Sequence, residues 1–189
     1  MNEPEVVLET PRLRLRRFAA GDADDLWALD QDPEVLRYLG DPPPRPPSLE
    51  QVSNQALPAF IAYYTQRPGY GFWAAETREG RAFVGWFHLR PTEREGEADL
   101  GYRLRRRAWG QGYGTEGSSG LIDLAFSRRD IHRVIAIAMP QNRASVRVMQ
   151  KAGMAFERRF VHPAGPEVVQ YCIRRSAVRA PWQKNLSVR

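Results

Sequence analysis

The segment Trp109-Gly110-Gln111-Gly112-Tyr113-Gly114-Thr115 lies between an expected strand at 98–104 and an expected helix from about 115 to 127. Its three glycines leave little side-chain bulk, so successive backbone amides can converge on an anion next to the positive end of the helix. Phosphate binding is one interpretation, and a tight strand-to-helix connection that needs glycine for its geometry alone is the other. The spacing matches neither the Rossmann nor the P-loop pattern.

Hydrophobic periodicity on both sides of this turn predicts a mixed α/β chain. Two short helices are expected near Asp22 and Pro33, a third at 48–66 with a kink or break at Pro58, and a fourth after the glycine turn. A fifth, short helix is expected from Asn142 to Ala152, closed by Gly153. The proline-rich segment 41–47 is expected to be a surface loop. Seven strands are expected, at 12–16, 72–75, 83–89, 98–104, 134–139, 156–161 and 168–174.

The composition fits one folded domain. The chain has 189 residues, of which 42% are hydrophobic and 26% charged, and its net charge is +6. A chain with this share of hydrophobic residues and with charges of both signs does not have the composition of an intrinsically disordered protein. We expect one domain over residues 1–175 and a basic tail over 176–189, with an oligomer contact, as in a homodimer, as the alternative for the tail. No long apolar run or leader-like start is present, so a cytoplasmic protein without membrane contact is expected.

Cysteine, histidine and arginine usage excludes several classes. The single Cys172 rules out an intrachain disulfide, and the three scattered histidines show no metal-ligand spacing, so no metal is expected. Arginines at 12, 14, 16–17, 103 and 105–107 motivate an alternative, an arginine-rich nucleic-acid-binding protein. Aromatic residues do not interleave with these charges, and acidic residues are plentiful, which disfavours nucleic acid as the partner.

Four motifs occur in a fixed order and spacing, and together they resemble the GNAT superfamily of acetyl-CoA-dependent N-acetyltransferases. They are Asp99-Leu100-Gly101-Tyr102, the glycine turn with Glu116, Asn142-Arg143-Ala144-Ser145, and Lys151-Ala152-Gly153-Met154. The resemblance is to the branch that contains the ribosomal-protein N-terminal alanine acetyltransferases, and it runs from about Leu8 to Arg175. It implies a mixed, mostly antiparallel seven-stranded sheet flanked by about four helices and splayed beside the fourth strand to admit CoA.

The resemblance also implies a donor site. The general signature of the superfamily fits 107–112 literally, but in this branch the matching hexapeptide begins at Trp109. The backbone amides from Gln111 to Thr115 would then hold the CoA pyrophosphate, and the backbone at Leu104 would pair with the pantetheine arm. The implied donor-binding residues are Leu104, Trp109, Gly110, Gln111, Gly112, Tyr113, Gly114, Thr115 and Asn142. Acetyl-CoA is the implied donor; a CoA-binding regulator without catalysis is a further alternative.

Acetyl transfer from a thioester to an amine needs a neutral nucleophile and a proton for the leaving thiolate. A lysine amine with a pKa of about 10.4 is neutral in roughly one molecule per thousand at pH 7, so a base helps. Asp99 is the candidate base, with Glu97 on the same strand face as the reserve. The alternative is a solvated carboxylate paired with an arginine.

Ser145 lies three residues after Asn142, in the first turn of a helix. The resemblance implies that Ser145 is a general acid near the thioester sulfur, and the alternative is a hydroxyl bonded to the helix backbone. Tyr102 and Tyr171 carry phenols that could donate a proton, although such residues more often pack. The histidines contribute little to this interpretation.

The acceptor is expected to be a primary amine, on a protein N-terminus or on a small molecule such as an aminoglycoside. In the resembled fold the loops at 41–47 and 162–166 flank the acceptor groove, so acceptor choice is encoded in segments with little sequence signal.

Overall fold

The computed structural model describes residues 3–163 and 165–177 of the chain. Most of the expected tail therefore lies outside the described residues. In chain order the elements are β1 (Val6–Glu9), β2 (Leu13–Arg17), η1 (Ala20–Asp22), α1 (Ala23–Leu29), α2 (Pro33–Leu36), α3 (Leu49–Gln51), the π-helical turn η2 (Val52–Ala56), α4 (Leu57–Gln66), β3 (Gly71–Thr77), β4 (Phe83–Pro91), β5 (Glu97–Leu104), η3 (Arg106–Ala108), α5 (Tyr113–Ser127), β6 (Arg133–Ala138), α6 (Arg143–Lys151), β7 (Ala155–Val161), β8 (Glu167–Arg174) and η4 (Arg175–Ala177).

The strands form one open sheet in the order β1-β2-β3-β4-β5-β6-β8-β7. Every neighbouring pair is antiparallel except β5 and β6, which are parallel. The fold class is thus the expected mixed α/β sheet, but the expected strand number of seven is wrong, because the sheet has eight. The missed strand is β1, whose short Val-Val-Leu-Glu sequence shows no alternation and which pairs with β2 through tertiary contact.

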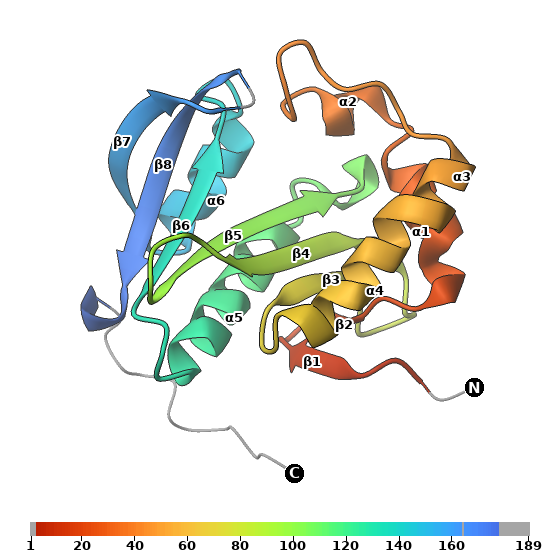
Figure 1. Cartoon of the computed structure of the whole chain (residues 1–189), viewed down its shortest axis with the longest axis horizontal. Helices are drawn as coiled ribbons and strands as arrows, with labels where there is room; N and C mark the ends of the chain where they lie inside the picture. The colour runs from red at the N-terminus through yellow and green to blue at the C-terminus, as the bar shows by residue number, and fades with distance from the viewer. Residues whose placement is uncertain (1–2, 164, 178–189) are drawn as a thin grey trace.

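Strands β5 and β6 separate along their length. Their register pairs Glu97–Asp99 with Arg133–Ile135 and then stops, although β5 continues to Leu104. Beyond Ile135, β6 pairs only with β8. The expected splay beside the 98–104 strand is confirmed, and Figure 1 shows β6 and β8 inclined away from β5. This opening exposes backbone of β5 in the middle of the sheet.

Helices cover both faces of the sheet (Figure 1). On one face α5 packs with Leu121 and Ile122 against Phe87 of β4, and on the other α1 and α4 pack around Trp86. Strand alternation sends neighbouring residues of β4 into separate core clusters. With α2, α6 and the continuous α3–η2–α4 segment, the described residues contain about five helices, one more than the resemblance implied.

Two local sequence features have structural reasons. Pro58 does not break the helix at 49–66, because the π-helical turn η2 precedes it and absorbs the change in hydrogen bonding. Gly117 and Gly120 lie in α5 where a side chain would not fit: an added Cβ would lie 2.3 Å from Phe87 and 2.9 Å from Leu8. Both glycines therefore allow close packing of α5 on the sheet.

Candidate functional site

A cavity of about 370 Å³ lies at the glycine turn. It is bounded by β5, α5, one side of α6 and the residues around α2. The sequence-predicted residues that line it are Leu104, Trp109, Gly110, Gly112, Tyr113, Gly114, Thr115, Asn142 and Ser145. The donor cavity, as we call this space, thus collects residues from three segments that are distant in the sequence.

The glycine turn has the backbone geometry of an anion cradle. Gly110 and Gly112 have φ angles of 73° and 85°, which side-chain-bearing residues rarely adopt. Gly112 is the N-cap of α5 and offers no side-chain cap, so the first amides of the helix have no acceptor within it. A phosphate group would satisfy these amides at the positive end of a fifteen-residue helix.

Gln111 is the one predicted donor residue that does not line the donor cavity. Its side-chain amide donates to the carbonyl of Arg107 at 2.7 Å, and its own carbonyl accepts from Arg12 at 2.9 Å. Arg12 also pairs with Glu116 at 2.6 Å and lies over the Tyr113 ring. Sequence reasoning missed Arg12 as a residue that holds the turn, because nothing in the alternating strand pattern indicates a partner 104 residues away.

The arginine clusters serve the fold. Arg103 Nη1 donates to both carboxylate oxygens of Asp30 at 2.6 Å, and Arg105 pairs with Asp25 at 2.7 Å. These two guanidinium groups are therefore engaged within the chain and are not free cations of the kind that nucleic-acid binding needs. Arg147 and Lys151 of α6 line the donor cavity and make no ion pair with a described carboxylate. They are the cations available to a phosphate there.

Ser145 and Tyr102 meet beside the donor cavity. The Ser145 hydroxyl lies 3.4 Å from the Tyr102 hydroxyl, and the Ser145 amide donates to Asn142 Oδ1 at 3.1 Å. Asn142 is thus the N-cap of α6, as predicted. Burial raises the pKa of Tyr102, against the opposing effect of its hydrogen bond to Ser145. A protonated phenol therefore accompanies the serine hydroxyl.

A groove of about 960 Å³ lies over the ends of β4, β5 and β6 and the β7–β8 hairpin. Asp99 lines this space, which we call the acceptor groove, whereas Tyr102, Arg103 and Leu104 of the same strand line the donor cavity. Arg103 lies on the Asp99 face of β5 and also lines the donor cavity, so this cavity reaches both faces at the end of the strand, whereas the groove lies on the Asp99 face. Ile135 and Ile137 of β6 give the acceptor groove an apolar floor, and Phe72 and Phe160 line it as well.

Asp99 is held by two donors through one oxygen. Arg90 forms an ion pair with Oδ2, and His88 Nε2 lies 3.3 Å from the same atom. No described residue donates to Oδ1. Burial raises the pKa of Asp99, but the hydrogen bond from His88 and the charge of Arg90 outweigh it, so the pKa lies below its ordinary value. Asp99 is therefore paired with an arginine, as in the alternative interpretation, but its Oδ1 atom is free beside the groove.

His88 is a site residue that sequence reasoning missed. Its ring stacks on Trp86, meets Phe72 edge-on and leaves Nδ1 buried without a described partner. Burial lowers the pKa of His88, with Asp99 acting in the opposite direction. Room for the ring comes from Gly101, where an added Cβ would lie 2.5 Å from the imidazole. Gly101 lies directly opposite His88 in the β4–β5 register. The sequence alone does not show this pairing, because it becomes visible only once the register is known.

Glu97, the reserve base, has a structural role. It forms a buried ion pair with Arg133 and accepts from the Thr92 hydroxyl at 3.0 Å. Arg133 also pairs with Glu157, and only 2% of Arg133 is exposed. Both Glu97 oxygens are therefore engaged, and this network ties β5 to β6 below the splay.

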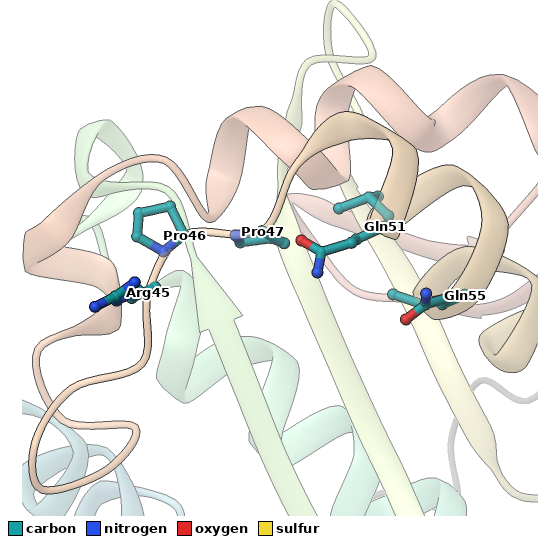
Figure 2. A pocket seen from close by; sticks show the side chains of 7 residues that line it. Arg45, Pro46, Pro47, Gln51 and Gln55 are labelled. Carbon is teal, nitrogen blue, oxygen red and sulfur yellow. The ribbon is translucent and has the colours of Figure 1, made fainter.

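The two loops expected beside the acceptor groove differ. His162 and Pro163 line it, but no residue of the 41–47 loop does. That loop borders a separate hollow of about 670 Å³, where Figure 2 shows Pro46 and Pro47 in the segment leading to the helix that carries Gln51 and Gln55. The proline loop is thus not a wall of the groove; Tyr38 and Leu39, just before it, line the donor cavity instead.

Among residues 3–163 and 165–177, no three His, Cys, Asp or Glu side chains gather as a metal site. No helix there is both long and apolar enough to cross a bilayer.

Comparisons with known proteins agree with this geometry. The model of the acetyltransferase (GNAT) domain matches residues 12–155. YkkB of Bacillus subtilis, an uncharacterised protein, is 31% identical over 157 residues, covering 80% of this chain and 86% of the relative. FsC-acetyl coenzyme A-N(2)-transacetylase of Aspergillus fumigatus is 30% identical over 186 residues, covering 93% and 77%. The structure of RimL, a ribosomal L7/L12 alpha-N-protein acetyltransferase in complex with coenzyme A, has a TM-score of 0.77 at 19% identity, covering 92% and 100%.

The opened sheet, the glycine turn at a helix N-terminus and the two spaces beside β5 define an acyl-CoA-dependent transferase. The chain belongs to the GNAT acetyltransferase family. It is an N-acetyltransferase that uses acetyl-CoA as donor and an amine as acceptor.

Proposed function

We propose that the acetyl group passes directly from acetyl-CoA in the donor cavity to a primary amine in the acceptor groove, through the opening between β5 and β6. The observation that carries this proposal is the placement of the two spaces along β5: Asp99 lines the groove where the pairing with β6 ends, and residues 102–104, beyond that point, line the cavity. Donor and acceptor then approach each other at the sheet opening, and orientation supplies much of the rate.

For the donor, we propose that the amides from Gln111 to Thr115 bind the pyrophosphate and that the Leu104 backbone faces the pantetheine arm. The positive φ angles at Gly110 and Gly112, two residues that line the donor cavity, support this, since such backbone conformations let successive amides converge on an anion. The Leu104 carbonyl already accepts from the Trp109 indole at 2.8 Å, which fixes the exposed Trp109 beside it. Asn142 then holds α6 against the same cavity.

For the chemistry, we propose Asp99 as the base and Ser145 as the acid. The amine attacks the thioester carbonyl carbon, the C–S bond breaks, and the amine nitrogen loses its proton to Asp99 Oδ1. The thiolate takes a proton from Ser145, which regains one from Tyr102 3.4 Å away, and the Tyr102 phenol is reprotonated from water in the donor cavity. No covalent enzyme intermediate is needed.

For the biological setting, we propose one domain over residues 1–175 acting in the cytoplasm, where the lone Cys172 stays reduced. The acceptor is the N-terminal amine of a protein or a small-molecule amine; the names of the two relatives with stated activities, an N(2)-transacetylase and an alpha-N-protein acetyltransferase, support both. A homodimer would form along β7, an edge strand that exposes Phe156 and Val161.

Calorimetric titration with acetyl-CoA tests the donor site. Gly112→Asp adds bulk and negative charge at the cradle and is expected to abolish micromolar binding. Gly80→Asp is the matched control, because Gly80 has a similar φ of 75°, lies on an open turn and is remote from the donor cavity. Equal binding by both variants, or none by the folded wild-type protein, would overturn the proposal.

A further inference from the structure

The charges that line the acceptor groove are balanced in number. Four arginines face four carboxylates, and the set is Arg90, Arg94, Arg133, Arg158, Glu93, Glu97, Asp99 and Glu157. A groove without net negative charge does not concentrate a polycation such as an aminoglycoside. Acceptor choice therefore depends on where the individual charges lie and which of them are already paired.

Pairing leaves one ordered guanidinium in the groove without a carboxylate. Arg90 is bound to Asp99, and Arg133 is bound to Glu97 and Glu157. Arg94 also forms no ion pair with a described carboxylate, but it is exposed on the β4–β5 loop beside Glu93, and no described side chain holds its guanidinium in place. Arg158 forms no ion pair with any carboxylate of residues 3–163 and 165–177.

Arg158 is nevertheless held in place. Its Nε and Nη2 atoms donate to Gln170 Oε1 at 3.3 and 3.1 Å, and its guanidinium lies 4.5 Å from the centre of the Phe160 ring. Gln170 is only 3% exposed, and its Nε2 donates to Glu157 at 2.7 Å. A flipped Gln170 amide would place its NH2 group against the Arg158 donors and its oxygen against Glu157, so the orientation of Gln170 is fixed. Arg158 Nη1 has no acceptor among the described residues.

The sheet register places Arg158 at the far side of the groove from Asp99. Asp99 pairs with Ile135, and Arg158 pairs through Gln170 with Ile137, two residues further along β6. Three inter-strand steps of roughly 4.8 Å each separate the two residues across the sheet. The apolar floor of Ile135 and Ile137 lies between them.

We propose that the acceptor is an amine that also carries a carboxylate, and that Arg158 binds this carboxylate while Asp99 receives the amine. This inference rests on the proposed function. The fork of a guanidinium suits a carboxylate, and a spacer of several bonds crosses the isoleucine floor. A small amino acid with a terminal amine and a peptide with an acidic side chain near its N-terminus share this chemistry.

Matched acceptors test the proposal with acetyl-CoA and the full chain. One arm compares 6-aminohexanoate and 8-aminooctanoate with their carboxamides, and the other compares the peptide amides Ala-Ala-Glu and Ala-Ala-Gln. In the arm that holds the natural source, the acid is expected to exceed its amide by roughly ten- to hundredfold in kcat/KM, mostly through KM. The two arms thus distinguish a small molecule from a protein N-terminus.

Arg158→Gln is expected to reduce the acid-to-amide ratio to near one. Arg159→Gln is the control, since Arg159 is the next residue on β7 and pairs at the surface with Glu167. Equal rates for acids and amides in both arms, or the same loss of ratio in both variants, would overturn the assignment while leaving the proposed function intact. Absence of any acetylation together with absence of acetyl-CoA binding would overturn both.

Discussion

The Nε2 atom of His88 lies 3.3 Å from Oδ2 of Asp99, so a buried imidazole supports the carboxylate proposed to receive the acceptor proton. Asp99 accepts from His88 and Arg90 through the same oxygen. Because the ionised carboxylate cannot donate, His88 must carry its proton on Nε2 in this contact. The pair therefore orients Asp99 with Oδ1 directed away from its two donors.

His88→Phe is expected to move the acidic limb of the kcat/KM profile to higher pH. His88 lowers the pKa of Asp99, so its removal raises that pKa, and protonated Asp99 then persists at a pH where the wild-type carboxylate is ionised. His88→Gln retains an N–H donor at similar reach and should keep the limb near the wild-type position. Superimposable profiles for all three proteins would exclude His88 as a positioning residue.

Gly101→Ala is expected to disturb the same pair from the neighbouring strand. The added methyl would lie 2.5 Å from the His88 ring, which Trp86 and Phe72 hold from other sides. Overpacking of this kind costs about 1–3 kcal/mol of unfolding free energy. Urea unfolding measures the loss, and Gly21→Ala is the control because nothing lies within 4 Å of its added Cβ. A Gly101→Ala protein as stable as the control would contradict the packing argument.

Ser145→Ala is expected to lower kcat by roughly a hundredfold, the usual size of a general-acid contribution. Tyr102→Phe should have a smaller effect if the phenol acts through Ser145, and the double variant should be little worse than Ser145→Ala alone. Steady-state release of CoA measures all three. An unchanged kcat for Ser145→Ala would leave Ser145 with only its contacts to Tyr102 and the Asn142 cap.

Glu97→Gln is expected to separate structure from catalysis. It leaves the buried Arg133 with one carboxylate instead of two and should cost about 3 kcal/mol of stability. The pH profile of the surviving activity should keep its wild-type shape, whereas Asp99→Asn should lower kcat by roughly a hundredfold or more. Glu167→Gln, which breaks an exposed pair, is the control for stability. A shifted profile in Glu97→Gln would return Glu97 to the role of base.

The local pattern was sufficient for much of the fold. Period-two and helical spacing located seven of the eight strands and the main helices, because alternation and capping are written into neighbouring residues. The strand β1 was not predicted, because its four residues show no alternation and form a strand only by pairing with β2. At Pro58, where a kink or break was expected, the helix continues after a π-helical turn, a form of irregularity that residue spacing does not reveal.

For the candidate site, the sequence by itself determined the glycine turn, the Asn142 cap and the carboxylate at 99, since each depends on residues adjacent in the chain. Tertiary structure decided which charges are free. Arg103 and Arg105 form ion pairs within the fold, and so does Glu97, with Arg133. His88 contacts Asp99 only because of the β4–β5 register. The physical reason is that ion pairs and buried hydrogen bonds join residues far apart in sequence, and short-range patterns contain no information about them.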